Sequence, residues 1–390
     1  MTDVMDDEGN FEELYGAWEP KLYAAAMAEN DRYFALLLGG TRWDDPYTII
    51  LTRDAVGQTF SRSDVRRELR DIRVLPSSDS NAYPSYVTIS RSGDIYVVRP
   101  AGSEHFVIPR TQAESEDAPD IEFNSIFPVG DNWLVSGSDG VMKLGKSTTW
   151  EDVAPKLETK YPYSPPKWSI LGANANGDIS VIAVEMSNTR YFNLYPGHEL
   201  YRDDMSEDEE DELQAKLYAE QKTYPMLTTL FTGRPGAWKR QELPQRIASS
   251  LPAYPYVSGQ VSGKTGRDYI FGSDGLIMEA MPSVDFSEIG SLPDREKHYS
   301  SGAFWRGDLI LVAGSELLRF DGHLTTPFSP KVRVKLGSPR VQPSAVFGRD
   351  EKLYVFDYGL RYFILDGNEW NQREIPTDLT ERPFKGGGEK

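Results

Sequence analysis

Residues 303–312 read Ala-Phe-Trp-Arg-Gly-Asp-Leu-Ile-Leu-Val: an apolar strand, a Gly-Asp turn and a second strand rich in branched residues. The same pattern recurs at residues 86–98 and 168–182, and at residues 345–356 with a polar turn at Asp350 in place of the Gly-Asp pair. Branched and aromatic residues favour strands, and Gly-Asp pairs favour tight turns. The chain therefore repeats a hairpin whose two strands are both predicted to be buried.

Two further strands are predicted to follow each hairpin. Residues 137–142 and 272–278 nearly repeat each other, and both contain the Asp-Gly pair that suits a two-residue turn before a third strand. Trp150, Trp238 and Trp370 each precede a proline by five or six residues, in a segment that reads as a fourth strand. Proline suits an outer edge strand, where no hydrogen-bond donor is needed.

The predicted start of the second strand serves as a ruler along the chain. It falls at Tyr47, Asp94, Asn132, Asp178, Asp268, Asp308 and Lys352, with spacings of 47, 38, 46, 90, 40 and 44 residues. Four-stranded propeller blades repeat every ~40–50 residues. The sequence therefore predicts an all-β protein, a β-propeller of about seven four-stranded blades, with six or eight as alternatives. The spacing of 90 predicts either one blade with a long insertion or two irregular blades.

The predicted organisation has three parts. Residues 1–30 form an N-terminal segment packed on the propeller, residues 31–376 form a single propeller domain, and residues 377–390 form a flexible tail. The first predicted blade, residues 32–76, contains the helix-like stretch 63–70. Roughly helical spacing in the N-terminal segment predicts a broken helix containing Phe11, Leu14, Trp18, Leu22 and Tyr23.

Residues 145–152, Gly-Lys-Ser-Thr-Thr-Trp-Glu-Asp, look like a degenerate Asp-box turn. On this motif and the repeat, the chain resembles bacterial propellers of the sialidase-like and kelch-like groups across residues 31–376. The box aspartate is displaced from its usual place, and no set of residues matches a sialidase active site. The resemblance therefore implies a fold and transfers no activity.

Composition excludes several classes of function. The formal net charge is −18, which disfavours binding to nucleic acids and to anionic membrane surfaces. The chain has no cysteine, so disulfides, thiolate nucleophiles and the common structural zinc sites are excluded. No run of 18 apolar residues is present, and the acidic residues 1–10 are not followed by an apolar signal segment. We expect a cytoplasmic protein.

No catalytic signature stands out. The four histidines, at positions 105, 198, 298 and 323, show neither the His-Glu-x-x-His spacing nor a nucleophile elbow. Residues 258–265 resemble a phosphate-binding loop but have one residue too few between the glycines, and the next residues read as a strand. We expect no catalytic residues, no cofactor and no metal.

An acidic insertion is the most distinctive local feature. Residues 203–212 hold eight acids in ten positions, and Ser206 with Glu209 forms a capping-box pattern that predicts a helix over about 207–222. Leu213 and Leu217 form an apolar stripe suited to packing on the propeller. The alternative is a solvated insertion whose charges only cap the helix and keep it soluble. The candidate partner-binding residues here are Glu207, Asp208, Glu209, Glu210, Asp211 and Glu212.

A second candidate contact is Trp43, with Asp44 and Asp45 beside it, in a segment that reads as a loop. An aromatic side chain flanked by charge on a loop is typical of a binding contact. Trp133, Trp168 and Trp305 lie in predicted strands and are expected in the core or in packing between blades.

These features predict a non-enzymatic, protein-binding propeller with a basic protein partner. One version is a bacterial immunity protein that neutralises a basic toxin of a toxin–antitoxin pair. The alternatives are a scaffold subunit of a larger assembly, and a propeller hydrolase or lyase with its site at the axial mouth.

Overall fold

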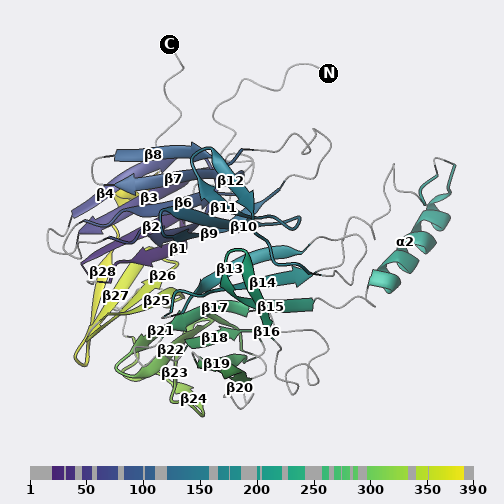
Figure 1. Cartoon of the computed structure of the whole chain (residues 1–390). Helices are drawn as coiled ribbons and strands as arrows, with labels where there is room; N and C mark the ends of the chain where they lie inside the picture. Colours follow the sequence, from purple (N-terminus) through teal and green to yellow (C-terminus); the bar gives the residue numbers. More distant parts are fainter. Residues whose placement is uncertain are drawn as a thin grey trace.

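The computed structural model arranges the chain as a ring of seven β-sheets, which confirms the predicted seven-bladed β-propeller (Figure 1). Each sheet contains four antiparallel strands that follow one another along the chain, and we name the sheets blades A to G in that order. The structure describes residues 20–29, 32–39, 46–54, 59–77, 83–99, 102–109, 121–157, 166–174, 176–185, 200–202, 204–221, 227–241, 257–262, 268–273, 275–281, 284–288, 297–332, 340–349 and 351–381.

Within each blade the strands run in chain order from the first, inner strand to the fourth, outer one. Blade A has β1 (Lys21–Met27), β2 (Tyr33–Gly39), β3 (Thr48–Asp54) and β4 (Thr59–Val65); blade B has β5 (Leu69–Val74), β6 (Tyr86–Ser90), β7 (Asp94–Arg99) and β8 (Gly102–Val107); blade C has β9 (Phe123–Val129), β10 (Asn132–Gly137), β11 (Met142–Lys146) and β12 (Thr149–Asp152); blade D has β13 (Lys167–Ala173), β14 (Ile179–Glu185), β15 (Leu227–Arg234) and β16 (Ala237–Gln241). Blade E has β17 (Val257–Ser262), β18 (Asp268–Gly272), β19 (Ile277–Met281) and β20 (Val284–Glu288); blade F has β21 (Tyr299–Trp305), β22 (Asp308–Ala313), β23 (Glu316–Phe320) and β24 (Thr325–Pro327); blade G has β25 (Pro343–Arg349), β26 (Lys352–Asp357), β27 (Arg361–Asp366) and β28 (Glu369–Glu374). Helix α2 (Glu207–Gln221) lies between β14 and β15, and the short 3₁₀ helix η1 (Thr377–Leu379) follows β28.

The core is divided into layers between blades. Every residue of β2 and of β14 is buried, because neighbouring blades cover both faces of a sheet. The outermost strand β28 alternates between exposed and half-buried residues. In the described part of the chain the buried apolar residues form seven clusters, each shared by two adjacent blades.

Turn chemistry and outer tryptophans behave as predicted. Asp139 and Gly140 both have positive φ, 54° and 75°, in the turn between β10 and β11. Trp150, Trp238 and Trp370 lie in the fourth strands β12, β16 and β28. The indole N–H of Trp238 donates to the carbonyl of Val153 at 2.6 Å. These side chains therefore fasten the outer edges of blades, and Trp238 joins blade D to blade C.

The ruler is correct for five blades and shifted by one strand in two. Asn132, Asp268, Asp308 and Lys352 begin the second strands of their blades, and Asp178 directly precedes β14. Tyr47 and Asp94, by contrast, mark third strands, β3 and β7. The shift arises because the first strand of blade A begins at Lys21, inside the segment 1–30 that was predicted to lie outside the sheets.

Local helical patterns at the N-terminal end of the propeller are overridden. Residues 63–70 end β4 and begin β5, because pairing with β3 and β6 replaces helical hydrogen bonds. Leu22 and Tyr23, the last residues of the predicted broken helix, lie in β1. Phe11, Leu14 and Trp18 lie outside the described residues.

The long spacing of 90 residues is explained by one blade with an insertion. Strands β14 and β15 pair along their whole length, Ile179 with Gly233 and Glu185 with Leu227. The 41 residues between them, 186–226, include α2. The alternative of two irregular blades is therefore wrong.

The ring closes by packing between blades A and G, whose sheets share no strand. One core cluster joins Phe34 of blade A to Phe356 and Tyr362 of blade G. The guanidinium of Arg349, at the end of β25, donates to the carbonyls of Met27 and Ala28, each at 2.8 Å. Closure therefore rests on side-chain packing and on hydrogen bonds from a side chain to backbone carbonyls.

The predicted tail begins as part of this junction. The guanidinium of Arg62 in β4 donates to the carbonyl of Leu379 at 3.1 Å, and Thr380 is buried. Residues 377–381 therefore lie against blade A, because the chain crosses from the last blade to the first. Residues 382–390 lie outside the described part.

Polar side chains of the inner strands also bind the next blade. In three of the seven inner strands, the side chain of the third residue accepts a hydrogen bond from the backbone N–H of the fourth residue of the following inner strand. Asp71 accepts from Ile126 at 3.1 Å, Ser125 from Ile170 at 3.0 Å and Ser301 from Val346 at 3.2 Å. These hydrogen bonds give acceptors to backbone N–H groups at the free edges of inner strands, where no further strand pairs.

Tyr47 makes the fold sensitive to alkaline pH. Burial, reinforced by the hydrogen bond that the hydroxyl donates to Asp64 at 2.6 Å, raises the pKa of Tyr47 to about 12. The folded state thus favours the neutral phenol, so this contribution is complete below pH 10 and is lost as pH rises through about 12.

We expect the stability advantage of the parent over Tyr47→Phe to fall by about 2 kcal/mol between pH 8 and pH 12. Urea unfolding of both proteins across this range measures it. Parallel pH profiles for the two proteins would show that Tyr47 is not responsible.

Candidate binding face

Strand order defines two faces of the ring. Because each blade has four antiparallel strands, the chain enters and leaves every blade on the same face. That face carries the connections between second and third strands and those between blades, and we call it the insertion face. The opposite face carries the remaining hairpin turns.

Helix α2 belongs to the insertion face of blade D. Its start is set by the predicted capping box: the N–H of Ser206 donates to the Glu209 carboxylate at 3.0 Å, and the N–H of Glu209 donates to the Ser206 hydroxyl at 3.4 Å. The hydrogen bonds that the Ser206 N–H and hydroxyl donate to the carboxylate lower the pKa of Glu209, so the carboxylate stays ionised at the positive end of the helix. Glu212 pairs with Lys216 one turn later, at 3.2 Å. The predicted helix is confirmed.

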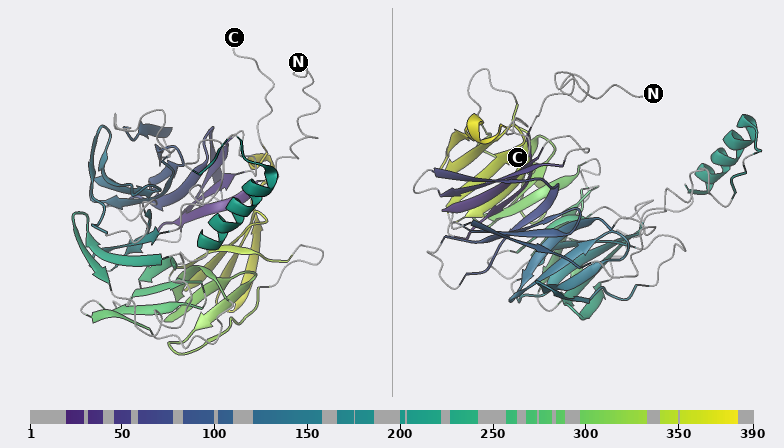
Figure 2. Two further views of the ribbon diagram at one scale, coloured as in Figure 1. Left: turned by 90° about the vertical axis from the view of Figure 1, so that its right-hand side faces the viewer. Right: turned by 90° about the horizontal axis from the view of Figure 1, so that it is seen from above.

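The helix stands away from the ring rather than on it. Figure 1 shows α2 separated from the blades, and the view onto the insertion face shows it in front of the ring (Figure 2). The predicted packing of Leu213 and Leu217 on the propeller is therefore wrong, although Leu217 is buried and Leu213 half-buried. Four of its acids, Asp208, Glu209, Asp211 and Glu212, are exposed, and Glu210 is half-buried.

Two parts of the predicted site are not described. Trp43, Asp44 and Asp45 lie outside the described residues. The flanking strand ends, Gly39 of β2 and Thr48 of β3, lie on the insertion face, as does α2. Glu207 begins α2, but its side chain is not among those described.

An ion-pair network on the insertion face was missed by sequence reasoning. The Arg91 guanidinium pairs with Glu122 and also lies 3.7 Å from Glu68, which pairs with Arg70 at 2.8 Å. These residues come from blades A to C and are separated by up to 54 positions in the sequence. No local pattern signals such a network, because the charges meet only when the ring forms.

Two exposed tyrosines lie on the same face. Tyr23 of β1 is 44% exposed, and Tyr358, between β26 and β27, is 43% exposed. Burial of the rest of its ring raises the pKa of Tyr23, and the charge of Glu68 adds to the effect while Arg70 opposes it. Aromatic rings that are half in contact with water are well suited to protein contacts.

The grouping of His105 with serines and a carboxylate does not have the geometry of a catalytic triad. Asp94 accepts from Ser90, Ser92 and Arg67 on one oxygen, and His105 Nε2 lies 2.9 Å from the other. In a triad the imidazole lies between the acid and the nucleophile. Burial alone would raise the pKa of Asp94, but these hydrogen bonds outweigh it and lower the pKa. The cluster holds an ionised carboxylate inside blade B.

The described residues also contain no metal site, no phosphate-binding loop and no helix suited to span a membrane. No group of three histidine, aspartate or glutamate side chains there is arranged to hold a metal ion. His198 lies outside the described part. Residues 258–262 of the phosphate-loop look-alike lie in β17, and β18 follows it. Among the helices that are described, none is long and apolar enough to cross a bilayer.

Comparisons with known proteins give only distant likenesses. No protein-family model matches the chain, and no curated protein matches it by sequence. Among solved structures, it is similar to YCF48 from Cyanidioschyzon merolae at 12% identity, over 93% of this chain and 97% of that one, with a TM-score of 0.49. It is also similar to Sqt1 from Saccharomyces cerevisiae at 10% identity, over 91% and 85% of the two chains, with a TM-score of 0.49.

Sqt1 from Chaetomium thermophilum, bound to the N-terminus of ribosomal protein L10, matches at 12% identity over 91% and 88% of the chains, with a TM-score of 0.48. At these identities and scores, no property of those proteins is transferred to this chain. These structures do not confirm the predicted relation to sialidase-like and kelch-like propellers. The propeller assignment rests on the strand order and on the seven layers of core between the blades.

Proposed function

We propose that this chain is a non-enzymatic propeller that binds a basic protein on its insertion face. The observation that supports it most is α2, an ordered acidic helix that stands in front of that face instead of packing on a blade (Figure 2). Exposed carboxylates there attract a cationic surface, and the net charge of −18 extends the attraction. Tyr23 and Tyr358 on the same face offer apolar contact area.

A finer form of this proposal is a bacterial immunity protein that covers a basic toxin. An acidic inhibitor gains most from electrostatic steering, because capture must outpace the damage that a toxin does. The exposed tyrosines equally suit a scaffold subunit, whose contacts are permanent. The two forms differ in how binding depends on salt. Electrostatic steering of a basic toxin weakens as the salt concentration rises, and the apolar contacts of a scaffold subunit do not.

Matched charge variants test the proposal. The first variant, D208N/E210Q/D211N/E212Q, removes four charges from α2 and spares Glu209, which caps the helix. The control, D131N/E351Q/D366N/E369Q, removes four exposed acids from the opposite face, so both proteins have the same formal net charge of about −14. Circular dichroism and urea unfolding establish that both are folded.

We expect the parent and the control to retain the same basic protein from a lysate of the source cells, and the α2 variant to retain at least about tenfold less. With the purified partner, the association rate of the parent should fall about tenfold between 50 mM and 500 mM salt. Equal retention by all three proteins would contradict a role for α2. Equal loss in both variants would show that only net charge matters.

A further inference from the structure

The junction between blades A and G contains a buried arginine held by aromatic rings. Arg53 of β3 is 6% exposed. Its guanidinium carbon lies 5.5 Å from the ring centre of Phe34, 5.6 Å from Phe60 and 5.1 Å from Tyr362. Two of these rings belong to blade A and the third to blade G. Aromatic faces attract a cation, so the cage fixes the guanidinium in place.

The rings leave two of the three nitrogens of this guanidinium without an acceptor in the described part of the chain. Arg53 Nε and Nη1 are buried and have no hydrogen-bond partner among the described residues. The adjacent carboxylate, Asp54, accepts instead from Arg32 Nε at 3.3 Å. A guanidinium does not lose its proton in a protein, and a buried charge without a partner is costly. The site therefore lacks an acceptor with negative charge.

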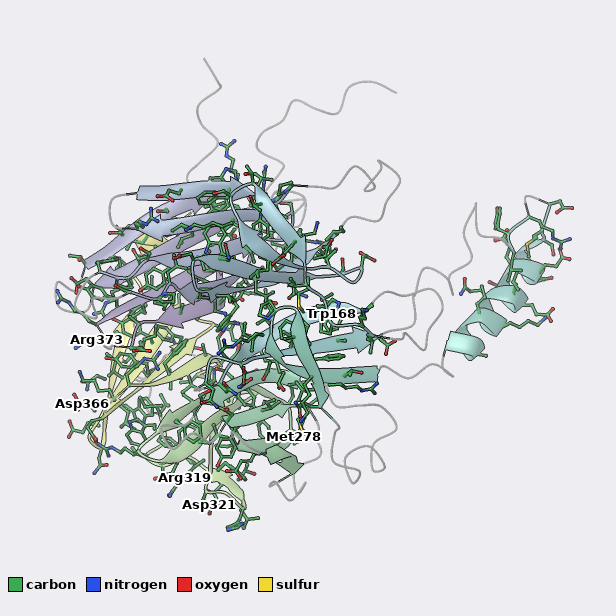
Figure 3. The ribbon with its side chains drawn as sticks, viewed as in Figure 1. Trp168, Met278, Arg319, Asp321, Asp366 and Arg373 are labelled. Atoms are coloured by element: carbon green, nitrogen blue, oxygen red, sulfur yellow. The ribbon has the colours of Figure 1, made fainter. Side chains whose placement is uncertain are left out.

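A second arginine lies on the same side of blade G. Arg373 of β28 is directly opposite Tyr362 of β27, and opposite residues of an antiparallel pair project from the same face of the sheet. Figure 3 labels Arg373 at the rim of the ring. Arg373 is exposed, and among the described residues neither it nor the Tyr362 hydroxyl has an ion-pair or hydrogen-bond partner. By contrast, Arg62 nearby is satisfied by Asp64 and by the carbonyl of Leu379.

The electrostatic surroundings of Tyr362 point the same way. Burial raises the pKa of Tyr362, and the charges of Arg53 and Arg373 oppose this shift. No carboxylate among the described residues contributes to it. The Arg53 guanidinium therefore lies over the Tyr362 ring, and Arg373 lies beside the same residue on the sheet.

We propose that Arg53, Tyr362 and Arg373 bind a small oxyanion, a phosphate or phosphoryl group, at the junction of blades A and G. Planar guanidinium groups match the geometry of phosphate oxygens, and the tyrosine hydroxyl supplies a further donor. This site is independent of the insertion face proposed for protein binding. Because the anion contacts two blades whose sheets share no strand, its binding stabilises the closed ring.

Phosphate binding to the full chain tests the proposal. Inorganic phosphate is titrated against potassium chloride at equal ionic strength, with thermal unfolding and calorimetry as readouts. We expect phosphate to raise the unfolding temperature by several degrees and chloride not to. Tyr362→Phe, which keeps the ring and removes the hydroxyl, should weaken phosphate binding about tenfold, and Arg373→Gln at least as much. Arg319→Gln, at the surface of blade F (Figure 3), should bind as the parent does.

A parallel titration with acetate distinguishes a phosphate site from one for carboxylates. Stabilisation by acetate but not by phosphate would overturn the proposal. So would phosphate binding that is unchanged in both Tyr362→Phe and Arg373→Gln, or the absence of any phosphate effect on the parent. Arg53→Met fills the cage without charge, and where it folds it should lose the phosphate response. Where Arg53→Met does not fold, Tyr362→Phe and Arg373→Gln decide whether the proposal holds.

Discussion

Replacing Asp357 with alanine is expected to lower the free energy of unfolding by about 3–5 kcal/mol. Asp357 is 1% exposed and accepts from Arg361 Nε at 2.8 Å and from the backbone N–H of Gln342, also at 2.8 Å. Alanine would remove the carboxylate with which the Arg361 guanidinium, itself 7% exposed, pairs. It would also leave the N–H of Gln342 without an acceptor.

A double variant separates loss of charge balance from loss of packing. Asp357→Leu with Arg361→Met removes both charges and retains apolar volume, so it should cost less than the single change to alanine. Urea unfolding of the parent, of Asp357→Leu and Arg361→Met alone, and of the double variant gives the coupling energy. A double variant that costs as much as the two single changes together would contradict a coupled pair.

Gly348→Ala is expected to cost about 3 kcal/mol, the upper part of the range for overpacking. A Cβ at Gly348 of β25 would lie 1.7 Å from the carbonyl oxygen of Phe304 in β21 and 3.3 Å from the Cβ of Trp305. The obstacle is backbone, so no side-chain rotation relieves it. Two neighbouring inner strands approach each other so closely here that only glycine fits.

Gly172→Ala provides the matched control. Gly172 also lies in an inner strand, β13, but its nearest neighbour to an added Cβ is Gln260 at 3.7 Å, an ordinary contact. We expect its midpoint of urea unfolding to be close to that of the parent or slightly higher, because alanine restricts the unfolded chain. Similar losses in the two variants would mean that inner strands require glycine for some reason other than the close approach at Phe304.

The repeat was readable from the sequence wherever a blade is built from local hairpins. In blades C, E, F and G, the second strand begins at the predicted residue, because the turn residues and the run of buried apolar residues lie within a few positions of each other. The Asp139-Gly140 turn needs positive φ at both residues, a demand that short-range chemistry meets. Blade number followed from counting these units.

Blade A was misread because its first strand has little strand propensity. Residues 21–27, Lys-Leu-Tyr-Ala-Ala-Ala-Met, contain three alanines, which favour helices. They form β1 because β2 supplies backbone partners and because Ala26 and Met27 are buried between blades. Packing against distant residues outweighs a weak local preference. Neither β1 nor the one-strand shift of the ruler in blades A and B could therefore be predicted.

The candidate binding face likewise has features that the sequence predicted and features that it did not. The capping box of Ser206 and Glu209 predicted α2 correctly, because all its partners lie within one turn. Its position could not be decided from the sequence, because Leu213 and Leu217 suggested packing on the propeller while the acidic residues also suited a solvated insertion. The network of Glu68, Arg91 and Glu122 left no trace in the sequence, and neither did the unpaired charge of Arg53.

The sequence by itself determined the hairpin repeat, the seven blades, the acidic helix and its start, because each depends on residues close together in the chain. Only the tertiary structure decided which strand opens the ring, how the ring closes without a shared sheet, and which charges of the described residues lack a partner. Those outcomes depend on contacts between residues such as Arg53 and Tyr362, which are 309 positions apart and meet only when blade G packs on blade A. Burial and charge balance at such contacts are properties of the closed ring, and no local pattern carries them.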